Sequence, residues 1–247
     1  MHSLTVIVPA AGVGRRLGRG RNKAFVEIGG LPLLVLCLRM LARTGLVRKA
    51  VVVTGAAEQE ETRVLLERYR QSCYPGLELV LAAGGKERQD SVANGLALIH
   101  DTEGYVAVHD GARPFAGKAV FERTLALAER CGAAIAAVPV KDTIKVAGPD
   151  GFVAATPARA TLRAAQTPQI FEISLLRRAY GHLAGQERGG HPVAVTDDAS
   201  LVEALGYPVA LAEGSQENIK VTTPEDLLLA EEILKKQDRE GAEPSAR

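Results

Sequence analysis

Small residues followed by cations stand near the start of the chain, where residues 9–25 read PAAGVGRRLGRGRNKAF. The backbone N–H groups of Ala10, Ala11 and Gly12 can approach an anion closely, and the arginines and Lys23 after them can neutralise it. Amides that orient a ligand and two or three fixed cations suit a polyphosphate. The stretch therefore predicts a triphosphate site, with a solvated basic segment as the structural alternative.

Two other glycine-rich motifs fit this stretch poorly. Gly12, Gly14 and Gly18 give G-x-G-x-x-x-G, a near miss to the dinucleotide fingerprint. The strand-like residues 50–54 end in Thr54, where a nicotinamide site would place an acid for the ribose hydroxyls. No G-K-[S/T] follows the glycines, which excludes a P-loop.

An aspartate follows the strand-like residues 105–109, within the segment VHDGARP. Asp110, at the carboxyl end of a buried strand beside a glycine turn, can hold Mg²⁺ against phosphate oxygens, directly or through water. The structural alternative is an ion pair between Asp110 and Arg113. His109 points to the opposite face and is expected to be a packed core histidine.

The glycine-rich segment at residues 84–92, GGKERQDSV, leads from a strand into a helix. Its backbone and the Ser91 hydroxyl can contact the edge of a small planar ligand such as a base. The simpler interpretation is that Asp90 or Ser91 caps the helix.

Further polar groups stand at the ends of extended segments downstream. Taken singly, each has an ordinary explanation as a strand residue, a surface charge, a helix cap or a solvated lysine. They are Thr143, Arg159, Thr167, Asp197 or Asp198, and Lys220.

The segments that must position these groups are of two kinds: short runs of β-branched residues alternate along the chain with helical patterns. This alternation predicts an α/β fold with a mostly parallel sheet flanked by helices. Ligands of such a sheet gather beyond the carboxyl ends of its strands. Strands are expected at residues 4–8, 50–54, 77–81, 105–109, 133–138, 209–211 and 219–221. Helices are expected at residues 33–43, 58–70, 91–99, 119–130, 173–183, 198–205 and from 224 onward.

The pattern changes at about residues 140–165. Short extended pieces at 140–146, 152–156 and 162–166 are separated by the turn sequence Gly-Pro-Asp-Gly at 148–151. No helix is available to cover these pieces. We therefore expect a protruding β-arm that is more stable packed on a second subunit than alone.

The final helix is predicted from Thr223 as N-cap and Pro224 at the first position. The sequence turns polar after Lys236 and is expected to fray. We expect a single domain over residues 1–236 and a polar tail over 237–247.

Composition narrows the class of protein. The chain has 247 residues, 30 basic against 29 acidic, so no overall field favours nucleic acid. No apolar run reaches the roughly 18 residues that span a bilayer, and no leader precedes the first strand, which predicts a cytoplasmic protein without membrane contact. Cys37, Cys73 and Cys131 are scattered without metal-like spacing and are expected to be structural.

Taken together and in order, eight segments resemble the 2-C-methyl-D-erythritol 4-phosphate cytidylyltransferase family of the non-mevalonate isoprenoid route. The resemblance covers the chain from about Thr5 to Leu234, and eight ordered blocks are far more specific than one glycine motif. The blocks are PAAGVGRRL, NKAF, GGKERQDSV, VHDGARP, VKDTIK, QTPQIF, TDDAS and NIKVTTPEDL.

The resemblance implies a Rossmann-like nucleotidyltransferase fold and a homodimer in which the arm embraces the partner. It implies that CTP and 2-C-methyl-D-erythritol 4-phosphate, a sugar-alcohol phosphate, give 4-diphosphocytidyl-2-C-methyl-D-erythritol and pyrophosphate, with Mg²⁺ or another divalent cation. Catalysis of this kind rests on positioning and on cations that stabilise the transition state.

The resemblance also assigns roles by position. It selects Arg16 over Arg15, whose side chains diverge by about 100° if a helical turn follows the glycines, and it leaves Arg15, Arg19 and Arg21 as surface charge. The implied roles are catalysis for Arg16, Lys23 and Lys220; nucleotide binding for Ala10, Ala11, Gly12, Gly85, Ser91 and Asp110; metal binding for Asp110; and acceptor binding for Thr143, Arg159, Lys220, Arg113 and Thr167, the first two from the neighbouring subunit.

One departure and three alternatives stay open. The family usually reads P-K-Q where this chain has Asn22, Lys23 and Ala24, and loss of the proline predicts a loop that is more mobile before CTP binds. Ribitol-5-phosphate cytidylyltransferase shares most of the blocks. A nicotinamide-dependent oxidoreductase is opposed by Thr54, and a non-catalytic nucleotide-binding protein would be expected to lack one of the implied site residues.

Overall fold

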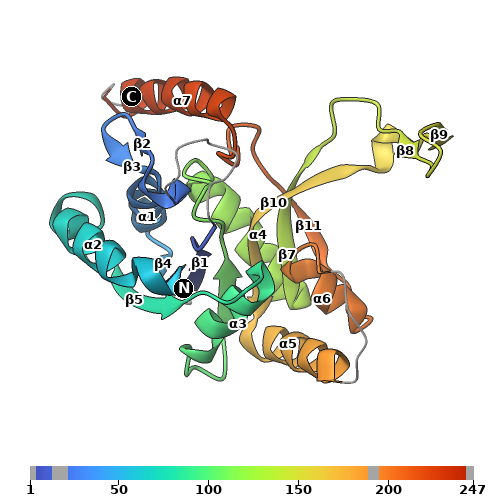
Figure 1. Cartoon of the computed structure of the whole chain (residues 1–247), viewed down its shortest axis with the longest axis horizontal. Coiled ribbons are helices and arrows are strands. Elements are labelled where there is room, and N and C mark those ends of the chain that lie inside the picture. The colour runs from blue at the N-terminus through green and yellow to red at the C-terminus, as the bar shows by residue number, and fades with distance from the viewer. Residues whose placement is uncertain (1–3, 13–21, 189–194, 243–247) are drawn as a thin grey trace.

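One mixed sheet forms the centre of the molecule. The computed structural model describes residues 4–12, 22–188 and 195–242. Within them, seven strands pair in the order β11-β7-β10-β6-β1-β4-β5, and β10 runs antiparallel to both of its neighbours while the other pairs are parallel (Figure 1). The strands are β1 (Leu4–Pro9), β4 (Val47–Thr54), β5 (Glu78–Ala83), β6 (Tyr105–Val108), β7 (Ala133–Pro139), β10 (Arg163–Glu172) and β11 (Ala210–Glu213).

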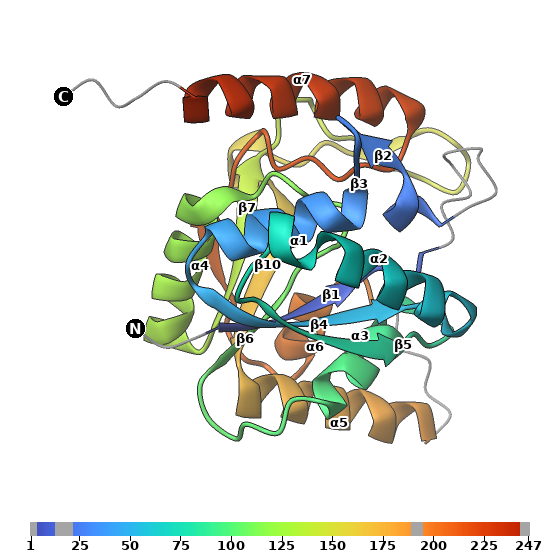
Figure 2. The same cartoon turned by 90° about the vertical axis from the view of Figure 1, so that its left-hand side faces the viewer.

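Helices cover both faces of this sheet (Figure 2). Val6 and Val8 of β1 belong to the core shared with α1, α2 and α4, whereas Ile7 belongs to the core shared with α3, α5 and α6. A strand buried on both faces must be apolar along its length, which explains the continuous run at the start of the chain. The helices are α1 (Leu33–Arg43), α2 (Gln59–Cys73), α3 (Arg88–Ala97), α4 (Gly117–Cys131), α5 (Ile173–Arg188), α6 (Asp198–Ala204) and α7 (Pro224–Ala242).

A small hairpin supports the last helix. β2 (Glu27–Ile28) and β3 (Leu31–Pro32) are joined through Gly29, whose φ of 58° favours a residue without a Cβ. A Cβ at Gly29 would also stand 2.5 Å from the Leu234 side chain of α7. Leu234 belongs to a buried apolar cluster that also contains Val221, just before α7. This contact fixes the segment that leads into the helix.

Most predicted elements form, but some helices begin or end at other residues than predicted. α1 has the predicted bounds, whereas α3 starts at Arg88 rather than at residue 91 because Glu87 is its N-cap and its backbone N–H donates to the Asp90 carboxylate at 2.9 Å. The N-cap is therefore Glu87 rather than Asp90 or Ser91, although Asp90 takes part in the cap from the third helical position. α7 is capped by Thr223, whose Oγ1 accepts the Asp226 N–H, and continues past Lys236 to residue 242.

One strand prediction was wrong and another was too short. Residues 219–221 form no strand, because the Val221 N–H bonds to the Ala112 oxygen whereas the Ile219 N–H turns back to the Glu217 oxygen. In contrast, the segment predicted to end at residue 166 continues to Glu172 as β10, which inserts between β6 and β7.

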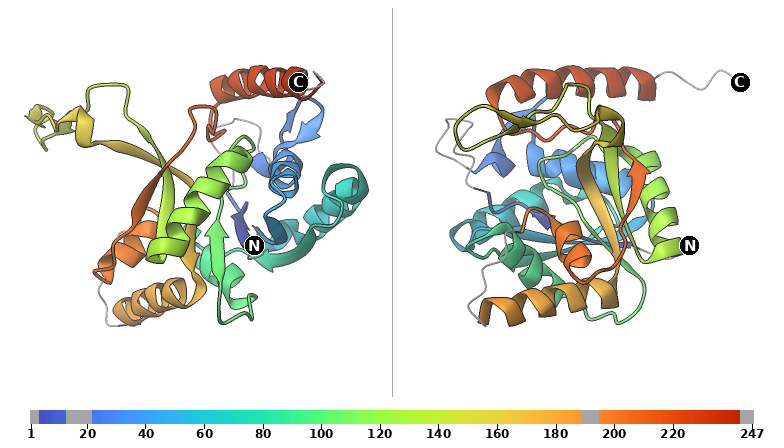
Figure 3. Two further views of the ribbon diagram at one scale, coloured as in Figure 1. Left: turned by 180° about the vertical axis from the view of Figure 1, so that it is seen from behind. Right: turned by 90° about the vertical axis from the view of Figure 1, so that its right-hand side faces the viewer.

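The arm between β7 and β10 protrudes from the body (Figures 1 and 3). Its tip is an antiparallel pair, β8 (Val146–Ala147) and β9 (Val153–Ala155), and a short 3-10 helix, η4 (Arg159–Thr161), leads back to β10. Phe152 and Val153 are 75% and 60% exposed. A hairpin arm was predicted here; its role in dimerisation stays a prediction.

Across the described ranges, no helix has both the length and the apolarity to cross a membrane. The three cysteines are free thiols, and Cys37 is buried.

Candidate active site

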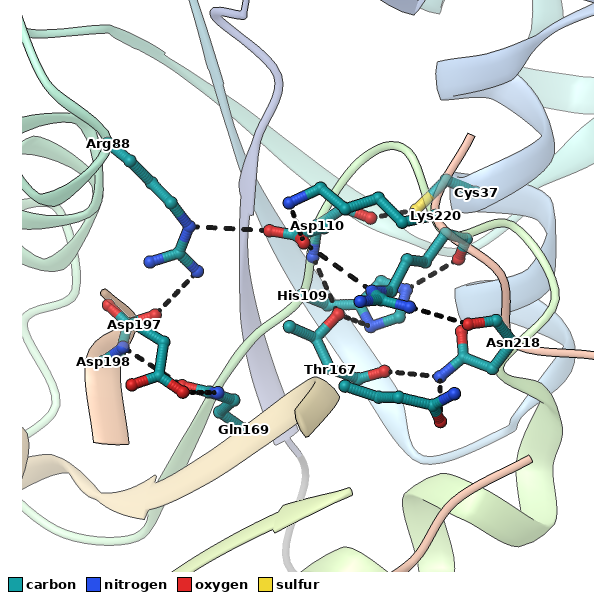
Figure 4. Close-up of polar contacts among 12 residues, drawn as sticks. Cys37, Arg88, His109, Asp110, Thr167, Gln169, Asp197, Asp198, Asn218 and Lys220 are labelled. Carbon is teal, nitrogen blue, oxygen red and sulfur yellow. Dashed lines mark hydrogen bonds and ion pairs between the residues drawn. The ribbon is translucent and has the colours of Figure 1, made fainter. Parts of the chain in front are cut away.

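Asp110 lies at the centre of the candidate site, two residues after the end of β6, and lines a cavity together with Pro9 at the end of β1. Its Oδ2 is 2.8 Å from Nζ of Lys220, and its Oδ1 is 3.6 Å from Nε of Arg88 (Figure 4). Oδ2 also lies 3.6 Å from Nε of Arg113. Burial alone would raise the pKa of Asp110, but these three cations hold it well below its ordinary range. The ion pair with Arg113 is therefore one contact of an ionised carboxylate in a cationic cluster.

Lys220 comes from the extended segment between β11 and α7. Nδ2 of Asn218, a fully buried side chain, donates to the Thr167 carbonyl at 2.8 Å, and the Val221 N–H donates to the Ala112 carbonyl at 2.9 Å. These bonds on either side of Lys220 replace the predicted strand and direct the lysine to the carboxylate.

His109 fixes the backbone on either side of Asp110. The Thr167 hydroxyl accepts the Asp110 N–H at 3.1 Å and lies 3.1 Å from Nδ1 of His109, whose Nε2 is 2.8 Å from the Arg113 carbonyl. Burial lowers the pKa of His109 to about 4, so the ring is neutral at pH 7. Because a carbonyl only accepts, Nε2 carries the proton and Nδ1 accepts from Thr167.

A cavity of about 210 Å³ opens beside Asp110, between the loops that follow β1 and β5. Ala11 and Gly12 line it, whereas Ala10 does not, since the Ala10 N–H donates to the Val53 carbonyl at 2.7 Å. The lining residues are Pro9, Ala11, Gly12, Lys23, Gly85, Lys86, Glu87, Arg88, Ser91, Asp110, Ala112 and Lys220.

Lys23 is placed by its neighbour Asn22. The Asn22 side chain donates to the Ala10 carbonyl at 2.9 Å and to Glu58 at 2.6 Å, and it accepts the Ala24 N–H at 3.0 Å. These three bonds tie the short 3-10 helix η2 (Lys23–Phe25) to the end of β1. The buried Asn22 side chain thus orders the start of η2 through three hydrogen bonds. That the loop is more mobile before CTP binds stays a prediction.

Gly85 and Ser91 shape the opposite wall. The Ser91 hydroxyl accepts the Gly85 N–H at 3.1 Å and donates to the Glu87 carbonyl at 3.2 Å, so it closes the loop on itself. A Cβ at Gly85 would collide with Cβ of Asp90, which explains the need for glycine in this close approach.

The arginines of the opening stretch, including Arg16, lie outside the described residues, as do Gly14 and Gly18. Their predicted roles stay predictions.

A second cavity, of about 300 Å³, adjoins the first, and Arg88, Asp110 and Lys220 line both. Of the predicted acceptor residues, the structure brings together those in the body of the chain. The lining residues are Arg88, Asp110, Arg113, Ala165, Gln166, Thr167, Gln169, Thr196, Asp197 and Lys220.

Thr143 and Arg159 line neither cavity of this chain. Both are exposed on the arm, where Nη1 of Arg159 donates to the Lys141 carbonyl at 3.0 Å. One folded chain therefore assembles only part of the predicted acceptor site.

Sequence reasoning missed Arg88, Gln169 and Asn218. Gln169 accepts the Asp198 N–H at 3.1 Å and donates to Oδ2 of Asp197 at 2.7 Å, the N-cap of α6. All three lie inside the sequence segments that resemble the family, so the segments were recognised but these residues were not assigned to the site. Their partners lie far away in sequence, and no local pattern indicated the contacts.

Known proteins share both this fold and this sequence. A family model described as 2-C-methyl-D-erythritol 4-phosphate cytidylyltransferase matches residues 4–236. The chain belongs to this family. A relative of that name from Bacillus velezensis is 45% identical over 231 residues, covering 93% of this chain and 95% of the relative.

Solved structures from the cytidylyltransferase family superimpose along nearly the whole chain. The enzyme from Thermus thermophilus has a TM-score of 0.73 at 35% identity and covers 95% of this chain and 100% of its own. The 4-diphosphocytidyl-2C-methyl-D-erythritol synthase from Anaerococcus prevotii has a TM-score of 0.79 at 29% identity, with 94% and 98% covered.

Family membership makes the chain a nucleotidyltransferase that transfers the cytidylyl group of CTP to 2-C-methyl-D-erythritol 4-phosphate in isoprenoid precursor biosynthesis. The predicted family, fold and activity are confirmed. The ribitol phosphate and oxidoreductase alternatives are not favoured.

Proposed function

We propose that the two adjoining cavities bind the two substrates of this reaction and that the new bond forms where they meet. This assignment rests on the residues that the two cavities share, because Arg88, Asp110 and Lys220 line both. The first cavity has the small-residue loop and Lys23 for a triphosphate. The second has Arg113 and Lys220 for the acceptor phosphate.

The base would lie against the loop from Gly85 to Ser91. Because the Ser91 hydroxyl already bonds within that loop, we assign it the task of shaping the base pocket, with backbone groups making part of the recognition. The triphosphate would extend from there along Ala11 and Gly12 toward Lys23, which lies beside Gly12.

The acceptor's phosphate oxygen would attack the α-phosphorus in line with the bond to the β-phosphate, which breaks as pyrophosphate leaves with its electron pair. An acceptor phosphate is largely ionised near pH 7, so no general base is required. The protein contributes positioning and positive charge, for which we assign Lys23, Lys220 and Arg16.

A divalent cation such as Mg²⁺ fits the donor set around Asp110. Mg²⁺ usually keeps several waters and binds through one or two carboxylates plus substrate phosphates, and Asp110 offers one ionised carboxylate to the nucleotide cavity. The described residues contain no group of three acidic, histidine or cysteine side chains that could hold a metal ion alone. The ion would neutralise phosphate charge, with Asp110 as its protein ligand.

The active form would be a homodimer. Thr143 and Arg159 stand on the exposed arm, away from the cavities of their own chain, and the apolar tip with Phe152 and Val153 suits burial on a second copy. We propose that each arm completes the acceptor site of the partner. The cytoplasmic location and the absence of nucleic-acid binding stay predictions from the sequence.

Pyrophosphate release from CTP and Mg²⁺ tests the activity, with 2-C-methyl-D-erythritol 4-phosphate or ribitol 5-phosphate offered in turn. We expect release with the first acceptor, little with the second and none without an acceptor. The Asp110→Asn variant, which keeps the shape of the side chain, should lose most of the rate. Absence of release with either acceptor would overturn the proposed function.

A further inference from the structure

Arg88 stands on the boundary between the two cavities. It is the first residue of α3, and its side chain is 29% exposed, so it is partly open to both. Nη2 of Arg88 lies 2.8 Å from Oδ2 of Asp198, and its Nε lies 3.6 Å from Oδ1 of Asp110 (Figure 4). The guanidinium thus extends between two carboxylates from different elements.

Asp198 is a fixed anchor for that guanidinium. Its side chain is fully buried, and its Oδ1 accepts the hydroxyl proton of the buried Tyr180 at 2.6 Å. Its backbone N–H and that of Ala199 both donate to Oε1 of Gln169 at 3.1 Å, which ties the start of α6 to β10. A buried carboxylate held on both its backbone and its side chain leaves its partner little freedom.

Arg88 keeps donors that its two carboxylates do not use. A separation of 3.6 Å from Asp110 is a charge contact and too long for a hydrogen bond, so the Nε–H is left for a ligand in the cavities. Burial opposes the charge of Arg88, but Asp198 and Asp110 outweigh it and raise its pKa. The side chain is therefore a permanent cation whose Nε–H is not used in a hydrogen bond by Asp110 or Asp198, its carboxylate partners among the described residues.

We propose that Arg88 is a further catalytic residue, which contacts the phosphate group at the junction of the two cavities, and that Asp198 is the positioning residue that holds it there. The inference rests on the proposed function of the cavities. Negative charge spreads over the equatorial oxygens of the α-phosphoryl group as the acceptor oxygen attacks and pyrophosphate leaves. A planar guanidinium suits such oxygens better than a point charge does.

Asp198 fixes the orientation of the Arg88 guanidinium. Without it, Arg88 would be free to move from its 3.6 Å ion pair with Asp110 to hydrogen-bonding distance and to occupy the carboxylate proposed for the metal ion. With one edge of the guanidinium held by Asp198, Arg88 stays at charge-contact distance from Asp110. The competing explanation is that the ion pair between Arg88 and Asp198 only holds α3 against α6.

The first test compares two arginines that both support α3. Arg88→Met keeps the aliphatic stem and removes the charge, and Arg177→Met is the matched control, because Nη2 of Arg177 bonds to the Ile99 carbonyl just beyond α3 and lines neither cavity. We expect Arg88→Met to lower kcat about 10²-fold with a much smaller change in KM for CTP. Arg177→Met should lower Tm with kcat within about twofold of the parent.

The second test asks whether Asp198 acts through Arg88. Asp198→Asn should lower kcat about tenfold in the parent chain and have no further effect in the Arg88→Met background. Equal losses in both backgrounds would overturn the positioning role. Arg88→Lys keeps a charge without the fork, and we expect it to fold and to recover only part of the lost kcat.

The outcomes separate this inference from the function on which it rests. If the parent chain releases no pyrophosphate, the proposed function fails. If the parent is active and folded Arg88→Met, or Arg88→Lys where the methionine variant does not fold, turns over at the parental rate, the role of Arg88 alone is refuted.

Discussion

Single cations matter at this site because the carboxylate between them is buried. The Asp110 side chain is 10% exposed, and Lys220, whose Nζ is 2.8 Å away, is 38% exposed. A lysine that is half in solvent and half in the cavity can leave Asp110 for a phosphate oxygen with little rearrangement. Lys23, beside Gly12, brings a second cation to the cavity proposed for the nucleotide.

Replacing either lysine by alanine should therefore impair the chemical step while the chain stays folded. For Lys23→Ala and Lys220→Ala we expect kcat to fall about 10² to 10³-fold, since each removes a charge that we propose to stabilise the transferring phosphoryl group. Steady-state kinetics and circular dichroism provide the measurements. Lys235→Ala, which removes an exposed α7 lysine that is paired with Glu232 at 2.7 Å, is the control. Near-parental rates in folded Lys23→Ala or Lys220→Ala would refute their assignment.

At the scale of elements, the sequence was most informative where burial follows a simple period. α1 has its predicted bounds because an apolar run, buried without interruption from Leu33 to Leu38 and again at Leu41, fills most of its eleven positions. β10 was only partly predicted because its middle reads QTPQ, and no periodic pattern marks it as core. Those side chains are buried through distant partners, such as the Ser215 carbonyl, which accepts from Gln166 at 2.8 Å.

The candidate site, too, was predicted where a local motif marks a residue and missed where the contact forms only in the fold. Asp110 and Lys220 were predicted from motif and family resemblance, and the structure places them together. Arg88 was missed because Asp198, which gives it its orientation, stands at the start of α6, and β6, α4, β7, the arm, β10 and α5 all come between them in the chain. A pair of charges that meets only in the fold leaves no local pattern.

His109 is the link between β6 and β10, and its neutrality makes that link sensitive to acid. The pKa of His109 is about 4 in the folded chain against an ordinary value of 6.5. Between these values the unfolded chain binds a proton that the folded chain does not, so stability falls as the pH falls. We expect His109 to account for a loss of about 3 kcal/mol between pH 7 and pH 4.

Urea unfolding of the nucleotide-free and metal-free protein at several pH values tests this expectation. The His109→Gln variant should be less stable at pH 7 and should show a flatter decline toward pH 4, because it has no proton to gain. Asp110 does not interfere in this window, since its pKa is lowered in the fold and its contribution is lost only as the pH falls below about 3.8. Parallel profiles for the two proteins would contradict the proposed link.

At the scale of the whole molecule, the positions of the proposed acceptor residues support our proposal of two chains per working site. Lys220 lines the cavities of its own chain, whereas Arg159 stands on an arm that projects away from them. Covering its exposed apolar tip would stabilise the arm, and under our proposal a second copy does so and brings Arg159 to a cavity that lacks it.

Mixing two inactive variants decides whether the arm acts in trans. In a dimer of one Lys220→Ala chain and one Arg159→Ala chain, the cavity of the second chain keeps Lys220 and would receive an intact arm from the first, while the other site carries both defects. Equal mixing should then restore about a quarter of the parental rate, because half of the dimers are mixed and each has one intact site. Chains refolded together and assayed for pyrophosphate release, with the separate variants as controls, provide the measurement. If Arg159 serves its own chain, every site in the mixture carries one defect, and the activity stays at the level of the separate variants.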